Sequence, residues 1–134
     1  MIIAVDFDGT IVEHRYPEIG DEIPFAFETL KALQKKGHQI ILWTYRSGEL
    51  LDEAVAFCEK KGVVFYAVNK SFPEEEQDCE QAKHRKIHAD IFIDDRNFGG
   101  LPSWGEIYQT LCPEEPAFPP RHKRKGFFSR LFVK

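Results

Sequence analysis

Apolar and polar residues follow one another in blocks that predict a repeating series of strands and helices. Short continuous apolar runs, typical of strands buried on both faces, alternate with segments whose apolar residues recur at helical spacing. In the first such segment Phe27, Leu30 and Leu33 share one face, and Gly37 follows as a stop signal. The predicted strands cover residues 1–6, 39–44, 63–68 and 90–94, and the predicted helices cover 24–36, 48–62, 73–86 and 103–111.

Two of the predicted helices begin with a capping-box pattern, in which a serine is followed three residues later by a glutamate. Ser71 and Glu74 form one such pair, and Ser103 and Glu106 form the other. The alternation of strands and helices predicts an α/β fold with a central parallel sheet, covered by helices on both faces.

Composition limits the classes of protein to consider. The chain has 134 residues, of which 43% are hydrophobic and 30% charged, as expected for one globular domain. No apolar run approaches the ~20 residues that span a membrane, and the first run is too short for a secretory signal. The three cysteines show no C-x-x-C spacing, so neither a disulfide framework nor a zinc site is indicated. We therefore expect a cytoplasmic protein.

Charge divides the chain into three parts. Residues 1–112 form the predicted domain, and residues 113–120, "PEEPAFPP", have the composition of a stiff linker. Residues 1–120 hold 12 basic and 22 acidic residues, a formal charge of −10, whereas the tail at 121–134 holds six basic residues and no acidic one. The tail also places Phe127, Phe128, Leu131 and Phe132 on one helical face. It is either a solvated basic end, a weak contact for an anionic membrane surface, or a segment that docks on a subunit.

Candidate chemistry lies at the ends of the predicted strands. The first strand ends in "DFDGT", with Asp6 and Asp8 two residues apart, and the fourth ends in Asp94 and Asp95. Asp-Gly could instead mark a hairpin turn, but the residues that follow do not alternate well. Because the carboxyl ends of parallel strands share one edge of a sheet, the four carboxylates are expected to meet there. A set of oxygen ligands favours Mg²⁺ over zinc.

These motifs resemble those of the haloacid dehalogenase (HAD) superfamily of phosphohydrolases. "DFDGT" resembles its first motif, "ILWT" its second, and "KIHADIFIDDR" its third and fourth, in the family's order over roughly residues 1–111. The resemblance implies a Rossmann-like, three-layer α/β/α fold and a Mg²⁺-dependent phosphatase. It implies Asp6 as the nucleophile that forms an aspartyl-phosphate and Asp8 as the general acid and base.

The resemblance also implies a phosphate-binding pair and a metal site. Thr44 and a lysine would bind the phosphoryl group, and Lys86 is favoured over Lys83 and Lys70 as that lysine. Asp6, Asp94, Asp95 and the backbone carbonyl of Asp8 would hold the Mg²⁺. Physical chemistry supports these roles, since a carboxylate attacks a phosphate dianion only when nearby positive charge neutralises it.

Arg46 is a substrate candidate, because it follows Thr44 by two residues and could bind the leaving group or a second phosphate. A salt bridge is an equal alternative. His14 follows the first motif and is most simply a solvated loop residue, and Trp43 is most simply part of the core.

The spacing of the motifs leaves no room for a cap domain. Thirty-three residues separate Thr10 from Thr44, and 41 separate Thr44 from Lys86, and the predicted elements occupy both intervals. The chain therefore resembles the capless class. An open site of this kind suggests a bulky phosphorylated substrate, whether a small molecule or a macromolecule, or a homo-oligomer that covers the site.

Two other functions remain as alternatives. A receiver-like signalling domain also uses an acidic Mg²⁺ cluster and an aspartyl-phosphate, but its phosphorylated aspartate ends the third strand, where this chain has Asn69 and Lys70. A catalytically idle scaffold that serves as a binding module is the second alternative.

Overall fold

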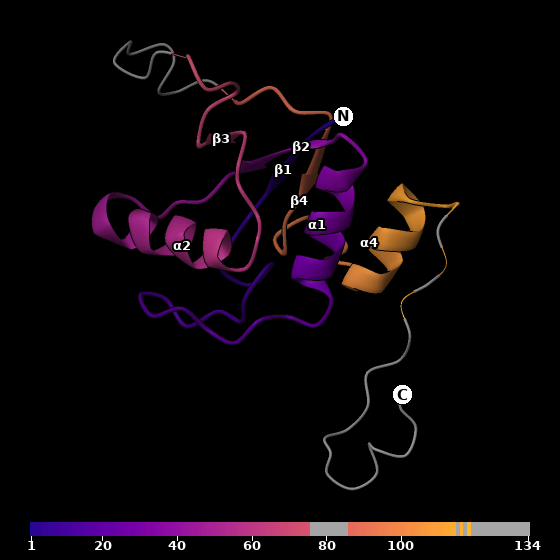
Figure 1. The fold of residues 1–134 in the computed structure, drawn as a ribbon. Coiled ribbons are helices and arrows are strands. Elements are labelled where there is room, and N and C mark those ends of the chain that lie inside the picture. Colours follow the sequence, from indigo (N-terminus) through magenta and orange to yellow (C-terminus); the bar gives the residue numbers. More distant parts are fainter. Residues whose placement is uncertain (76–85, 115, 117, 119–134) are drawn as a thin grey trace, which may run out of the picture.

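The protein is an α/β domain built around a parallel four-stranded sheet (Figure 1). The computed structural model describes residues 1–75, 86–114, 116 and 118. The strands are β1 (Ile2–Val5), β2 (Gln39–Leu42), β3 (Ala67–Val68) and β4 (Ile91–Ile93), in the order β3-β2-β1-β4. The described helices are α1 (Ala26–Lys35), α2 (Gly48–Lys60) and α4 (Trp104–Leu111). The prediction of a parallel sheet with intervening helices is thus confirmed.

Strand β1 lies between β2 and β4 in the sheet. It pairs in parallel with β2, where Val5 faces Leu42, and with β4, where Val5 faces Ile93. Three strands therefore end at the same level, and the residues that follow them come together at one edge.

Both faces of the sheet are apolar, as the continuous hydrophobic strands predict. Ile3, Val5, Ile40, Leu42 and Ile93 face the main core, which also contains buried side chains from α1, α2 and α4. Figure 1 shows α1 and α4 side by side on this face. Ala4, Ile41 and Ala67 belong to a second buried cluster, which Ile87 completes.

The strand over 63–68 is shorter than predicted, because only Ala67 and Val68 pair with β2. The amide of Val63 donates to the carbonyl of Cys58 at 3.0 Å, so Val63 belongs to the turn that follows α2 and not to the strand. The predicted helix over 73–86 lies mostly outside the described residues. The Ser71 amide donates to the carboxylate of Glu75 rather than forming the predicted pair with Glu74.

The second predicted cap is confirmed at Ser103, the N-cap of α4. Its hydroxyl accepts a bond from the Glu106 amide at 3.2 Å, and its amide donates to the Glu106 carboxylate at 3.3 Å. None of the helices in the described part of the chain is long and apolar enough to cross a membrane. The basic tail, with its predicted membrane or subunit contact, lies outside the described residues.

The loop after β1 doubles back on itself, which the sequence did not favour. Val12 and Glu22 form an antiparallel bridge, and the Glu13 amide donates to the Asp21 carbonyl at 2.8 Å. The reversal takes place over residues 14–20 and not at Asp8-Gly9. We call residues 11–23 the flap.

Candidate functional site

Two adjacent strands bring three carboxylates to one point. Asp6 directly follows β1, and its amide donates to the carbonyl of Ile93 at 3.0 Å. This bond continues the pairing of β1 with β4 and places Asp6 beside the Asp94-Asp95 pair. Carboxylate oxygens of Asp6, Asp94 and Asp95 all lie within 4.8 Å of one another. We call these three residues the acidic cluster.

Thr10 links the two halves of the acidic cluster. Its hydroxyl lies 3.1 Å from Oδ2 of Asp6 and 3.3 Å from Oδ1 of Asp95, and can donate its one proton to either. The same oxygen accepts a bond from the Asp95 amide at 3.0 Å. The Thr10 carbonyl in turn accepts a bond from the indole of Trp104 at 2.8 Å, so α4 fixes this turn from the core side.

The surroundings of Asp6 disfavour its charged form. Burial, the negative charge of Asp94 and a hydrogen bond with Asp95 raise the pKa of Asp6 to about 7, against a partial opposing effect of Thr10. Three carboxylates at such short range repel one another unless a proton or a cation reduces their charge. The arrangement is therefore one that a divalent cation would stabilise.

Gly9 makes the close approach of Asp95 possible. Its φ is +86°, a left-handed conformation, and a Cβ there would lie 2.9 Å from the carboxyl carbon of Asp95 and closer still to Oδ2. A side chain at this position would push Asp95 away from the acidic cluster.

Asp8 has a different partner from Asp6. Nε and Nη2 of Arg46 donate to Oδ2 and Oδ1 of Asp8, each at 2.8 Å, which is a bidentate pair. The Arg46 side chain is 0% exposed, and that of Asp8 is 11% exposed. Of the two alternatives for Arg46, the structure therefore has the salt bridge, and the guanidinium does not face the open cleft.

Arg46 also connects three segments around Asp8. Its Nη2 donates to the Glu18 carbonyl in the flap at 3.0 Å, and its Nη1 lies 3.4 Å from the Leu50 carbonyl in α2. The guanidinium carbon lies over the rings of Phe7 and Tyr16, 5.2 Å and 5.1 Å from their centroids. The hydrogen bonds to Asp8 raise the pKa of Arg46, so the charge on this side chain is permanent.

A cleft of about 410 Å³ opens over these residues. Thr44 lies in its wall, as predicted, and its amide donates to Oδ1 of Asn69 at 2.8 Å. The Thr44 hydroxyl accepts a bond from the Arg46 amide at 3.2 Å. The full lining comprises Asp6, Asp8, His14, Trp43, Thr44, Tyr45, Asp94 and Arg96.

The structure does not bring the predicted lysine to this cleft. The ammonium of Lys86 lies 5.1 Å from the ring centroid of Phe92, and Lys86 lines a different hollow with Ile2 and His88. Lys70 lines a third hollow beside α2, and Lys83 lies outside the described residues. The predicted contact between Lys86 and a phosphoryl group therefore has no support in this geometry.

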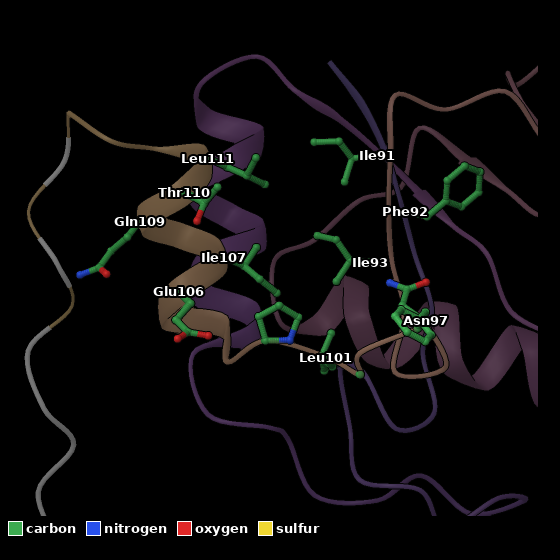
Figure 2. A pocket seen from close by; sticks show the side chains of 13 residues that line it. Ile91, Phe92, Ile93, Asn97, Leu101, Glu106, Ile107, Gln109, Thr110 and Leu111 are labelled. Carbon is green, nitrogen blue, oxygen red and sulfur yellow. The ribbon is translucent and has the colours of Figure 1, made fainter.

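A larger hollow, about 730 Å³, lies between β4 and α4 (Figure 2). Ile91, Ile93, Ile107 and Leu111 give it an apolar lining, and Glu106 is its one charged lining residue. That glutamate is already used in the cap of α4. We therefore place the candidate site at the smaller cleft, where the reactive groups lie.

Sequence reasoning gave no role to three residues of the site, Thr10, Tyr45 and Arg96. Thr10 is the last residue of "DFDGT", and its place in this motif, four residues after Asp6, could have indicated that it lies beside the carboxylates. Arg96 follows the acidic pair directly, and its amide donates to Oδ1 of Asp94 at 2.9 Å. Arg96 is exposed, and among the described residues that line the cleft it is the one lysine or arginine.

The chain is similar to a conserved protein from Bacteroides thetaiotaomicron whose structure has been solved. The two are 59% identical and superpose with a TM-score of 0.77, over 87% of this chain and 93% of the other. No family model and no curated protein matches the sequence. The chain belongs to the same family as the Bacteroides protein.

Proposed function

We propose that this chain is a Mg²⁺-dependent phosphatase that hydrolyses a phosphomonoester through an aspartyl-phosphate on Asp6. The observation that carries the proposal is the acidic cluster, in which three carboxylates from two adjacent strand ends converge at the carboxyl edge of a parallel sheet. This edge is where ligands bind in folds of this type. The resemblance of the four motifs to the HAD superfamily agrees with the same assignment.

The acidic cluster fits Mg²⁺ in both chemistry and size. All its donor atoms are carboxylate oxygens, which hard divalent cations prefer. Octahedral ligands at about 2.1 Å from Mg²⁺ lie about 3 Å apart when adjacent and about 4.2 Å apart when opposite. Oxygens that already lie within 4.8 Å of one another need only small rotations to reach these positions. Bound there, Mg²⁺ would reduce the charge of the carboxylates and of the phosphoryl oxygens.

In the proposed first step, a carboxylate oxygen of Asp6 attacks phosphorus. A new bond forms between phosphorus and Asp6, and the bond to the leaving-group oxygen breaks, with that oxygen taking up a proton. In the second step water attacks the same phosphorus, and the bond to Asp6 breaks. This releases phosphate and regenerates Asp6.

Asp8 is proposed to move the protons in both steps, with Arg46 as a positioning residue. The bidentate pair uses one lone pair on each oxygen of Asp8 and leaves others free to accept a proton from water. Acting as a base on water therefore requires no rearrangement of the pair. Acting first as an acid requires Asp8 to carry a proton while it remains beside Arg46.

Thr44 and Arg96 are proposed to bind the phosphoryl oxygens, since both line the cleft. Arg96 takes the place that the sequence had suggested for Lys86, because its side chain is exposed at the same cleft. The proposal includes a HAD-type three-layer fold without a cap domain. The second buried cluster, around Ile41 and Ile87, marks the face of the sheet opposite the main core. In a three-layer fold, a second layer of helices would cover this face.

The test is phosphate release from a panel of phosphomonoesters, measured with Mg²⁺ and with excess EDTA. We expect Mg²⁺-dependent turnover that Asp6→Asn lowers by at least a thousandfold, because the nucleophile is lost. Asp52→Asn is the matched control, since Asp52 is an exposed acid in α2, outside the cleft. Near-wild-type turnover in Asp6→Asn would overturn the proposal. A stable phosphoenzyme without phosphate release would favour the receiver-like alternative, and no phosphorylation at all would favour the idle scaffold.

A further inference from the structure

One wall of the candidate cleft is aromatic, and the acidic cluster does not explain it. Trp43 and Tyr45 flank Thr44 and line the cleft together with the imidazole of His14. Tyr45 is 69% exposed, whereas tyrosine is a residue of intermediate burial in most proteins. The exposed ring therefore lies at the mouth of the cavity that holds the proposed nucleophile.

The ring of Tyr45 is supported from behind. Its centroid lies 4.9 Å from that of Tyr16 at an interplanar angle of 55°. Tyr16 in turn lies against the buried guanidinium of Arg46. This tilted contact joins the flap to the segment after β2 and restricts the Tyr45 ring on one side, while most of the residue remains exposed. Such a supported ring can bind a second ring without first being ordered.

The charges of the cleft restrict what can lie against this wall. Arg46 neutralises Asp8, and Arg96, the basic residue of the lining, is assigned above to the phosphoryl group. Among the described residues, the lining therefore offers no further lysine or arginine to a leaving group that carries additional negative charge, and Asp94 disfavours such a group. A neutral planar ring is not repelled by these acids and gains stacking energy on tyrosine and tryptophan. The cavity of about 410 Å³ has room for a phosphoryl group and a ring of this kind.

We propose that Tyr45, with Trp43, binds a planar aromatic ring in the leaving group, so that the substrate is a phosphomonoester of a nucleoside or of an aryl-bearing alcohol. This proposal rests on the proposed phosphatase function and names its substrate class. It assigns Tyr45 as a specificity-determining residue that contacts the part of the substrate lost in the first step.

The test compares substrates that differ only in the ring. A nucleoside 5′-monophosphate and ribose 5-phosphate share the same phosphoester and sugar, so the ratio of their kcat/KM values measures the contribution of the base. We expect the full-length chain to prefer the nucleotide by about tenfold, the usual size of one base–aromatic stack. Tyr45→Ala should remove most of this preference, and Tyr45→Phe should keep it.

Phe98→Ala is the matched control, because Phe98 is a fully exposed aromatic residue in the larger hollow between β4 and α4. It should leave the ratio unchanged. A second pair, 2-phenylethyl phosphate and ethyl phosphate, separates the two sources of the ring. A Tyr45-dependent preference in both pairs indicates a general ring site, and a preference for nucleotides alone indicates a nucleobase site. An identical ratio in the wild type and Tyr45→Ala would overturn the inference.

Calorimetric binding of the same pairs to the Mg²⁺-loaded chain separates the failure of this inference from that of the phosphatase. If nothing is hydrolysed but the nucleotide binds about tenfold more tightly than ribose 5-phosphate through Tyr45, the ring site stands and the phosphatase does not. If hydrolysis occurs with no Tyr45-dependent preference in either measurement, the phosphatase stands and the ring site does not.

Discussion

Asp6 and Asp8 lie two residues apart in one motif, yet the charges around them are opposite. Asp6 lies among other carboxylates, and its pKa is raised to about 7. Asp8 is held by two hydrogen bonds from a buried guanidinium. The protein thus neutralises one of the two aspartates with its own side chain and leaves the other in a cluster that a cation would complete. This difference matches the two proposed roles, proton transfer for Asp8 and nucleophilic attack for Asp6.

The largest effect on stability is expected from breaking the pair of Asp8 and Arg46. Arg46→Met should lower the free energy of unfolding by about 3–5 kcal/mol, because it leaves a largely buried carboxylate without its partner. Chemical denaturation measures this. Arg15→Met is the control, since Arg15 pairs with Glu13 and Asp21 on the surface, where such pairs contribute about 1 kcal/mol or less. Adding Asp8→Asn to Arg46→Met should recover part of the loss, and equal losses in the two arginine variants would show that burial of the pair is unimportant.

A smaller but more selective effect is expected at Gly9. Gly9→Ala and Gly99→Ala both force alanine into a left-handed conformation, at a cost of about 1–2 kcal/mol. Only Gly9→Ala also brings a Cβ against Asp95, whereas nothing lies within 4 Å of a Cβ at Gly99. We therefore expect Gly9→Ala to weaken Mg²⁺ binding at least tenfold by calorimetry and Gly99→Ala to leave it unchanged. Equal Mg²⁺ affinities would mean that the acidic cluster does not depend on this turn.

The acidic cluster should also make stability depend on pH. The pKa of Asp6 is about 7 in the folded protein, against 3.8 for an ordinary solvated aspartate, so between these values the folded state binds a proton that the unfolded state lacks. The melting temperature without metal should therefore fall as the pH rises from about 4 to about 7. Mg²⁺ should raise it more at pH 8 than at pH 5, compared with NaCl at equal ionic strength. Asp6→Asn should reduce both trends, and an unchanged Mg²⁺ effect in that variant would contradict the assignment of Asp6 as a ligand.

The smallest effect is expected from removing the basic tail. Truncation after Pro120 should leave phosphate release unchanged, because the described site is complete without these residues. Its only expected consequence is a loss of weak, salt-sensitive binding to anionic vesicles, measured by co-sedimentation at low and high salt. Sizing chromatography of the same two proteins tests the alternative contact with a second subunit. If both measurements are unchanged, the tail is a solvated end.

The parts of the molecule that follow from local patterns were predictable. The strands around Ile3, Ile41 and Ile93 were read from continuous apolar runs, and the start of α4 from the pattern of Ser103 and Glu106. The convergence of Asp6 with Asp94 and Asp95 followed from one rule, that parallel strands end at a common edge. These features depend on short stretches of sequence and on the topology of the sheet.

The parts that depend on long side chains and tertiary packing were not predictable. Arg46 and Lys86 each extend several bonds from the backbone, so their positions in the sequence did not show which group the charge would reach. The strand over 63–68 was overestimated because the turn that ends α2 still includes Val63, whose amide donates to the Cys58 carbonyl, so only Ala67 and Val68 pair with β2. The flap depends on hydrogen bonds from the Glu13 amide to the Asp21 carbonyl and from the Ile23 amide to the Ile11 carbonyl. The sequence of these residues lacks the alternation of a regular hairpin.

Because β1 lies between β2 and β4, the parts of the candidate site can form only in a certain order during synthesis of the chain. Arg46 follows Asp8 by 38 positions, so this pair can form once β2 and the start of α2 have left the ribosome. Asp95 follows Thr10 by 85 positions, so the acidic cluster must wait until β4 has been synthesised and has docked on β1. At about 5–20 residues per second, several seconds separate the two events. Mg²⁺ binding at the acidic cluster would therefore be acquired only when β4 joins the sheet.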